Sequence, residues 1–203
     1  MNAPDFDGAV AYAIGRLRSE LSPQFTYHNL WHTQHEVMPA AINLARMSHS
    51  NESDIQLLTV AAAFHDIGFV EVKQNHELTG ARIVSQILPN FGFTSTQIEI
   101  IIGLIIATRL PQNPRTPLEE CIADADMDVL GREDFMARNR CLRDERANTG
   151  TPFTDHEWLQ EQLDFAQSHT YFTVAARKLR EEYKKQNIVT LQQHLDEIVA
   201  KAG

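Results

Sequence analysis

Cysteine is scarce in this chain: only Cys121 and Cys141 occur among its 203 residues. A folded chain of this length buries roughly 70% of the surface that its unfolded form exposes, so its core needs no disulfide. We therefore expect both thiols to be reduced, as in a cytoplasmic protein. The first ten residues, MNAPDFDGAV, have neither a basic nor an apolar segment and do not resemble a secretory signal.

Long apolar runs and excess positive charge are also missing. The longest apolar stretch, 98–107, is interrupted by Glu99 and Gly103, and it is half of the roughly 20 residues that a membrane span needs. The chain has 18 Lys and Arg residues against 27 Asp and Glu, a net charge of −9. Such a charge repels polyanions, so we expect neither a membrane nor duplex nucleic acid as a partner. A bound metal would still attract a small phosphate.

Strand-like alternation of apolar and polar residues is absent too. Apolar residues recur every three or four positions along most of the chain, which predicts an all-α protein. A helix over 29–47 is expected to bend at Pro39, and another helix is expected over 118–130. Since no Gly- or Ser-rich linker divides the chain, we expect residues 1–203 to form a single domain.

Histidine, by contrast, is abundant, with nine copies. His28, His32 and His35 are spaced by four and three residues, so all three can project from one helix face. His65 and Asp66 end a nearly all-apolar segment, where a buried carboxylate must be paired or bound to a metal. Two interpretations remain for these residues taken alone: they converge on a divalent metal, or they only satisfy hydrogen bonds.

Three aspartates alternate with apolar residues in the segment 123–131. On a helix Asp124 and Asp128 share a face, whereas Asp126 projects about 200° away from Asp124. Their apolar neighbours leave little solvated surface, so we expect at least one of the three to point inward. An acidic, solvated helix face is the alternative.

Taken in order, His32, His65-Asp66 and Asp126 resemble the signature of the HD superfamily of metal-dependent phosphohydrolases. The segment 27–33, YHNLWHT, is also similar to the Tyr-His-Asn-x-x-His motif of cyclic nucleotide phosphodiesterases and of many bacterial HD proteins. One His-Asp doublet is a weak signal, but four elements in order with these neighbours are specific.

The resemblance covers about 27–131. It implies an all-α HD-domain helical bundle, of the small stand-alone bacterial type, with 132–203 as a C-terminal helical extension. It also implies hydrolysis of a phosphate ester of a small nucleotide or a related phosphorylated metabolite. The water that attacks the phosphate would be activated by the metal.

The resemblance further implies that one divalent metal is held by His32, His65, Asp66 and Asp126. Asp124 is the alternative to Asp126, since each follows an alanine. Asp126 is favoured because the distal aspartate of the family typically precedes an apolar or basic residue, here methionine. The identity of the ion stays open among Mn, Fe, Co, Ni, Zn and Mg, because mixed nitrogen and oxygen ligands suit all of them.

The resemblance assigns catalytic roles to two residues. Asp66 orients the nucleophilic water, and His28 matches the histidine with which phosphodiesterases protonate the leaving oxygen. The alternative for His28 is support of a ligand or of the helix start. Candidates for substrate contact are His76, Lys73 and Arg109, and His76 is also a candidate ligand of a second metal.

Three questions stay open at this level. The substrate can be a monoester or a diester. The site can also bind metal or nucleotide without turnover, as a regulatory HD module, because a fold does not determine a function. The aromatic residues within 153–179 are expected to cover the HD core or to form the face of a homodimer.

Overall fold

The computed structural model describes residues 3–202, and every regular element within that range is a helix, which confirms the all-α class. In chain order the elements are α1 (Phe6–Glu20), the π-helical η1 (His32–Val37), α2 (Met38–Met47), α3 (Glu52–Phe64), the 3₁₀ turn η2 (Ile67–Val70), α4 (His76–Ile87), the 3₁₀ turn η3 (Leu88–Phe91), α5 (Ser95–Ala107), α6 (Pro117–Asp126), the 3₁₀ turn η4 (Asp128–Gly131), α7 (Phe135–Asn148), α8 (Asp155–Ser168) and α9 (Val174–Ala202). Across this described range, no helix has both the length and the apolar composition that crossing a bilayer requires.

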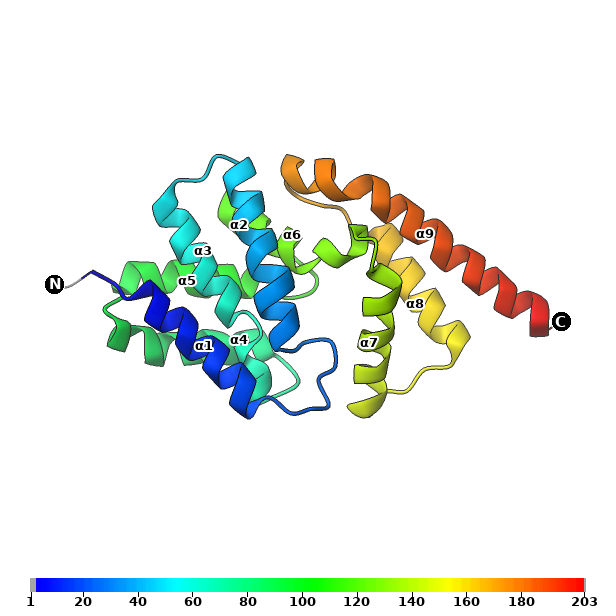
Figure 1. Ribbon diagram of the computed structural model, residues 1–203, viewed down its shortest axis with the longest axis horizontal. Coiled ribbons are helices and arrows are strands. Elements are labelled where there is room, and N and C mark those ends of the chain that lie inside the picture. Colours follow the sequence, from blue (N-terminus) through cyan, green and yellow to red (C-terminus); the bar gives the residue numbers. More distant parts are fainter. Residues whose placement is uncertain (1–2, 203) are drawn as a thin grey trace.

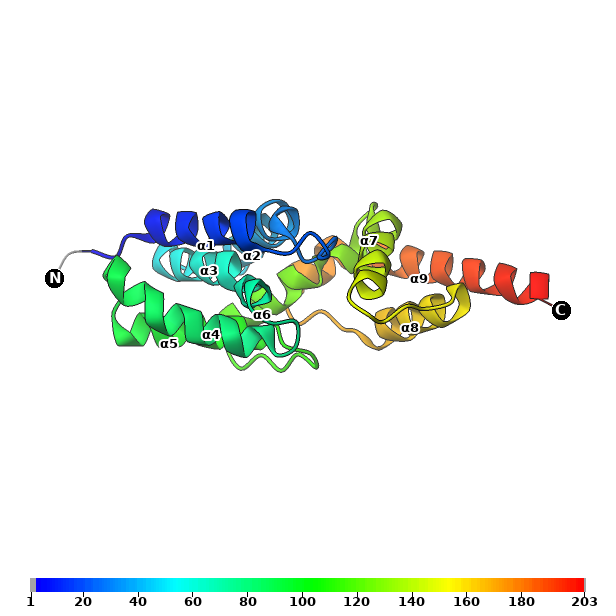
Figure 2. The same ribbon diagram turned by 90° about the horizontal axis from the view of Figure 1, so that it is seen from below.

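Helix α3 is the centre of the N-terminal helix group because it is apolar on almost every side. Every residue of 60–64 is buried, and Asn51 caps the first turn by accepting the N–H of Asp54. Helices α1, α2 and α5 pack against α3. Figure 2 shows α3 between α1 on one side and the pair α4 and α5 on the other. This position places the residues that follow α3, His65 and Asp66, inside the molecule.

Helices α7, α8 and α9 form a second group at the opposite end of the molecule, where α9 leads to the C-terminus (Figure 1). Trp158 and Tyr171 are buried in this group, so these aromatic residues serve packing. Helix α9 packs against α8 and also contacts η4 and α2. It thereby connects the second group to the first.

The expectation of one helix over 118–130 is wrong. Helix α6 ends at Asp126, and the tighter turn η4 follows. The cause is an ion pair with α9: the Asp128 carboxylate accepts hydrogen bonds from Arg180 Nε at 2.6 Å and from Nη2 at 3.0 Å. A Cβ on Gly131 would lie 2.4 Å from the Arg180 carbonyl oxygen, so only glycine allows η4 to approach α9 this closely.

The irregularity expected near Pro39 takes the form of a π-helical segment, η1, directly before α2. Pro39 has no N–H to donate to the carbonyl of His35, and its ring would clash with that carbonyl in an α-helix. The wider π-helical turn avoids this clash. Short π-helical segments are frequent at functional sites, and His32 is the first residue of this one.

His169, between α8 and α9, makes the stability of the second helix group sensitive to acid. Both of its ring nitrogens are buried, and neither has a hydrogen-bond partner among residues 3–202. Burial and the nearby charge of Lys184 lower the pKa of His169 from 6.5 to about 4. Between these two values the unfolded chain binds a proton that the folded chain does not, so stability present above pH 6.5 is lost as the pH falls toward 4.

Wild type is expected to lose stability between pH 7.5 and pH 4.5, and we expect His169→Phe to lose about 2 kcal/mol less than wild type over the same range. The phenyl ring can keep the packing against Tyr171, which lies 4.6 Å from the imidazole centroid to centroid. Urea denaturation at the two pH values measures the effect. The exposed His194 supplies the control: His194→Phe should lose as much stability as wild type, and an equal loss in His169→Phe would disprove the assignment.

Candidate metal centre and adjoining cavities

Four side chains that the sequence predicts as metal ligands converge in the structure. His32 begins η1, His65 and Asp66 follow α3, and Asp126 ends α6. One ligand atom from each of His32, His65 and Asp66 lies within 4.8 Å of the others, and all three residues are buried. The Oδ1 atom of Asp126 lies 3.3 Å from His32 Nε2 and 3.6 Å from His65 Nε2. We refer to these four residues as the His-Asp cluster.

The donor atoms of the His-Asp cluster fit a metal ion. His65 Nε2 and Asp66 Oδ2 are buried 3.1 Å apart, and within the described chain neither atom has a hydrogen-bond partner. The other ring nitrogen of His65, Nδ1, lies 2.8 Å from Ala62 O, to which it donates a hydrogen bond, so Nε2 is the ring nitrogen that faces the cluster. A buried polar atom without a partner costs about 1–3 kcal/mol. Imidazole nitrogens together with carboxylate oxygens are suitable ligands for a divalent metal, which would remove that cost.

The electrostatics of the cluster favour a positive charge at its centre. Burial by itself lowers the pKa of His32, but hydrogen bonds with Asp126 and Glu36 outweigh burial and raise that pKa to about 9. Burial raises the pKa of Asp66, yet His65 and His76 hold it well below its ordinary value. Protons on the imidazoles therefore balance the carboxylates in the absence of a metal, and a divalent ion can take their place.

Glu36 holds His32 from the side opposite to the cluster. His32 Nδ1 donates a hydrogen bond to Glu36 Oε2 at 2.9 Å, which leaves Nε2 directed at the cluster. Arg132 Nη2 and Arg138 Nε lie 3.1 and 3.0 Å from Glu36 Oε1, so the buried carboxylate is paired. Partners of this kind fix the tautomer and the orientation of a metal-binding histidine.

Glu145 holds His28 in a similar way. The Oε1 atom of this buried glutamate lies 2.5 Å from His28 Nδ1, and Oε2 accepts the backbone N–H groups of Tyr27 and His28. Burial raises the pKa of Glu145, but the hydrogen bonds from His28 and the backbone outweigh it and lower the pKa, so the group stays ionised. Nε2 is then the ring nitrogen of His28 that remains available to a substrate.

Asp124 is not part of the cluster. It is fully buried, and its carboxylate accepts the backbone N–H of Phe172 and that of Thr173, each at 2.8 Å, directly before α9. Asp126 is two positions further along α6 and points in the other direction, toward His32. The structure thus gives the two aspartates different partners, as their separation of about 200° requires.

Of the three candidates for substrate contact, the structure brings two to the site. His76 Nε2 lies 3.4 Å from Asp66 Oδ1, and the imidazole stacks on Phe69. Arg109 also lines the site cavity, and its Nη2 atom donates a hydrogen bond to Oδ1 of Asn75, the residue before His76, at 3.1 Å. Lys73 lies elsewhere and donates to the carbonyl of Thr149.

Gly68 sets the position of His76. A Cβ at residue 68 would lie 1.9 Å from the carbonyl oxygen of His76, so the backbones of η2 and α4 touch at this point. No other residue permits such an approach without displacing α4. The glycine after the His-Asp doublet therefore allows His76 to reach Asp66.

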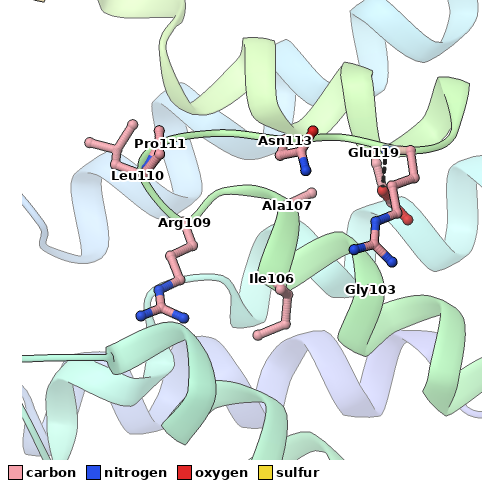
Figure 3. Close-up of a pocket in the computed structure, with 9 residues that line it drawn as sticks. Gly103, Ile106, Ala107, Arg109, Leu110, Pro111, Asn113 and Glu119 are labelled. Carbon is pink, nitrogen blue, oxygen red and sulfur yellow. Dashed lines mark hydrogen bonds between the residues drawn. The ribbon is translucent and has the colours of Figure 1, made fainter.

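The His-Asp cluster opens into a cavity of about 420 Å³, the site cavity. His28, Asp66 and Asp126 line its floor, and His76 and Arg109 lie around them. A second cavity, of about 440 Å³, lies between the end of α5 and the loop before α6 and contains no member of the cluster. In Figure 3 Arg109, which borders both cavities, extends away from the loop that carries Asn113. The site cavity is thus the space in which a substrate can reach the cluster.

Comparisons with known proteins agree with this geometry. Residues 34–127 match the family model described as HD domain, the family that the sequence motifs resemble. The matched range begins after His28 and His32. A search of curated proteins yielded no match.

Two solved structures are similar to this chain. One is a predicted HD superfamily hydrolase from an uncultured Thermotogales bacterium, with 19% identity, a TM-score of 0.61, and coverage of 98% of this chain and 94% of the other. The other is Bacillus subtilis YpgQ in complex with ADP, with 17% identity, a TM-score of 0.62, and coverage of 93% and 96%. At these identities the likeness concerns the fold, which extends over nearly the whole chain, including α7 to α9.

Several residues around the site were missed in the sequence. Glu36 lies four positions after His32, a spacing that places two side chains next to each other on a helix and could have identified it. Arg138 and Glu145 lie more than 100 positions from the residues that they hold, and no local pattern marks them. Their roles depend on how α7 lies against η1 and the segment before it, which contains His28.

Proposed function

We propose that this protein is a metal-dependent phosphohydrolase that acts on a small nucleotide or a related phosphate ester. The observation that carries the proposal is the pair of buried atoms without partners, His65 Nε2 and Asp66 Oδ2, in a cluster whose members Asp66 and Asp126 line the site cavity. These atoms lie where donors from three separate helical segments converge. Such a site is suited to hold a cation and to present it to a ligand in the cavity.

In this proposal His32, His65, Asp66 and Asp126 hold one divalent ion. A bound ion of this kind supplies two effects: it lowers the pKa of a water ligand toward 7, and it polarises a phosphoryl oxygen. The remaining work falls to side chains. Asp66 directs its Oδ2 atom toward the cluster and its Oδ1 atom toward His76. Asp66 can therefore accept a proton from the nucleophilic water and keep that water in line with the phosphorus.

His28 and Arg109 complete the proposed machinery. His28 borders the site cavity, and Glu145 occupies its Nδ1 atom, so Nε2 can deliver a proton to the oxygen of the leaving group. Arg109 and His76 are placed to neutralise the phosphoryl oxygens. Helix α7 supplies Glu145, and we therefore propose that residues 1–203 act as a single HD-type domain.

Two observations favour a nucleotide as the substrate. One solved relative of the same fold, YpgQ, is in complex with ADP, and the site cavity has cationic groups at its wall in a chain of net charge −9. The alternative is a regulatory module that binds metal or nucleotide without turnover. It has the same ligands, so only turnover separates the two.

The test is turnover by protein loaded in turn with Mn²⁺, Co²⁺, Ni²⁺, Zn²⁺ or Mg²⁺, followed by release of inorganic phosphate from monoesters and by chromatographic detection of the nucleoside monophosphate from cyclic nucleotides. A panel of nucleoside mono-, di- and triphosphates, cyclic nucleotides and ribose 5-phosphate would serve as substrates. We expect turnover that depends on the metal and is lost with a chelator. Binding of metal and nucleotide without turnover on any substrate would establish the regulatory alternative.

A further inference from the structure

A third cavity, the side cavity, adjoins the site cavity and has a different character. It has a volume of about 220 Å³ and lies between η4, α7 and α8. Its wall is mostly apolar, with Val129, Phe135, Leu142 and Phe165 among the lining residues. It shares His28, Leu110 and Met127 with the site cavity. The two cavities therefore meet at the histidine proposed to deliver the proton.

The apolar wall contains a polar group whose orientation is determined. The indole N–H of Trp158 donates to Asn139 Oδ1 at 2.7 Å, and Asn139 Nδ2 donates to Gln162 Oε1 at 2.6 Å. An indole nitrogen can only donate, so it dictates which way both amides point. All three side chains are buried. Gln162 is left with its Nε2 group as a donor, and Gln162 lines the side cavity.

The position of the side cavity relative to His28 indicates what it holds. In hydrolysis of a phosphate ester, the leaving group is bonded to the oxygen that the acid protonates. A phosphate over the His-Asp cluster with its ester oxygen at His28 has the rest of the substrate beyond His28, where the side cavity begins. The side cavity is mostly apolar, contains the oriented donor of Gln162, and is also lined by the ion pair of Arg146 and Glu161. Such a space accommodates a flat, largely apolar group that carries an acceptor at its edge.

We propose that the side cavity binds the heterocyclic base of a nucleotide substrate and that the Gln162 amide donates a hydrogen bond to an acceptor at the edge of the base. This inference rests on the proposed function, because it uses the same phosphate position and the same acid. It adds a specificity-determining residue, Gln162, and a positioning pair behind it, Asn139 and Trp158. The base, rather than the phosphate alone, then decides which esters are hydrolysed.

The first experiment compares two substrates that differ only in the base. Ribose 5-phosphate has the leaving oxygen of a nucleoside 5′-monophosphate and no base. Gln162→Met keeps the volume of the side chain and removes the donor, so kcat/KM should fall about 10-fold for the best nucleoside monophosphate and stay unchanged for ribose 5-phosphate. Gln167→Met, on the exposed side of the same helix, is the matched control and should change neither value.

A second variant tests the cavity itself in case Gln162→Met unfolds. Leu142 lines the side cavity and is absent from the wall of the site cavity. Leu142→Trp should fill the space and reduce turnover of the nucleotide while leaving turnover of ribose 5-phosphate intact. A melting curve of each variant establishes that it is folded. Equal losses on both substrates, or no loss on either, would overturn the proposal.

The third experiment requires no turnover. The chain has two tryptophans, so Trp31→Phe leaves Trp158 as the only fluorescent indole. Trp158 is hydrogen-bonded to Asn139, which in turn is hydrogen-bonded to Gln162. Adenosine, guanosine, cytidine or uridine, all without phosphate, should change its emission and show saturation transfer in NMR, and Gln162→Met should weaken both signals. Nucleoside binding without phosphate release would leave this inference standing and reject the proposed function. Phosphate release with no binding of any nucleoside, by fluorescence or by NMR, would support the proposed function and reject this inference.

Discussion

Asp126→Ala is expected to remove the metal and abolish turnover, whereas Asp124→Ala is expected to retain both. The two aspartates are two positions apart on α6, yet only Asp126 lies within reach of His32 and His65. With Asp126 removed, the remaining donors no longer enclose the ion on the side of α6. Elemental analysis of protein purified without chelator, together with phosphate release, measures both effects.

Asp124→Ala, the matched variant, should lose stability rather than metal. Asp124→Ala leaves the backbone N–H groups of Phe172 and Thr173, directly before α9, without an acceptor. The loss is about 2 kcal/mol, which lowers Tm by about 4–8 °C. Asp126→Ala should lose the metal, which Asp124→Ala retains, so metal content separates the two variants. Loss of metal in Asp124→Ala with retention in Asp126→Ala would exchange the roles of the two residues.

His28→Ala is expected to lower turnover by about 10²- to 10⁴-fold while metal content stays at the wild-type level, because a positioned general acid contributes that much. The loss should depend on the leaving group. A nitrophenolate leaves without a proton, so the deficit on nitrophenyl phosphate should be small. A nucleoside alkoxide requires a proton, so the deficit on the nucleotide should be large.

Glu145→Gln extends the same test to the residue that holds His28. The amide can still accept a backbone N–H through its oxygen, but its NH₂ group cannot accept the proton of His28 Nδ1 as the carboxylate does. We expect the same dependence on the leaving group as for His28→Ala, with a smaller deficit. Equal deficits on both substrates, or loss of metal from His28→Ala, would show that His28 is a ligand or a structural support.

The helical class was accessible from the sequence because it leaves local traces, and the residues of the His-Asp cluster were accessible through the order of motifs that resembles the HD superfamily. Apolar residues at spacings of three and four predict helices wherever they occur. The all-apolar segment before His65 places that residue and Asp66 at the buried end of a helix. The different directions of the Asp124 and Asp126 side chains follow from the helical rotation of about 100° per residue.

The boundaries that the sequence misplaced have tertiary causes. Helix α6 ends at Asp126 because Asp128 pairs with Arg180, which lies 52 positions away on α9. No property of the segment 118–130 contains that information. The π-helical η1 lies between the two cases, since Pro39 predicts an irregularity and the structure shows that it takes the form of a π-helical segment.

What the sequence by itself determined, then, is the type of fold, because helices depend on residue types at short spacings along one backbone. The set of candidate ligands came from the resemblance of the ordered motifs to the HD superfamily. The tertiary structure alone decided that Asp126 faces the two histidines and Asp124 caps α9, that Glu145 holds His28, and that Lys73 lies away from the site. It also decided that the amide of Gln162, oriented by its hydrogen bond with Asn139, lines the side cavity. Each of these results joins helices from distant parts of the chain, and the direction in which two helices pack is set by the whole core rather than by either segment.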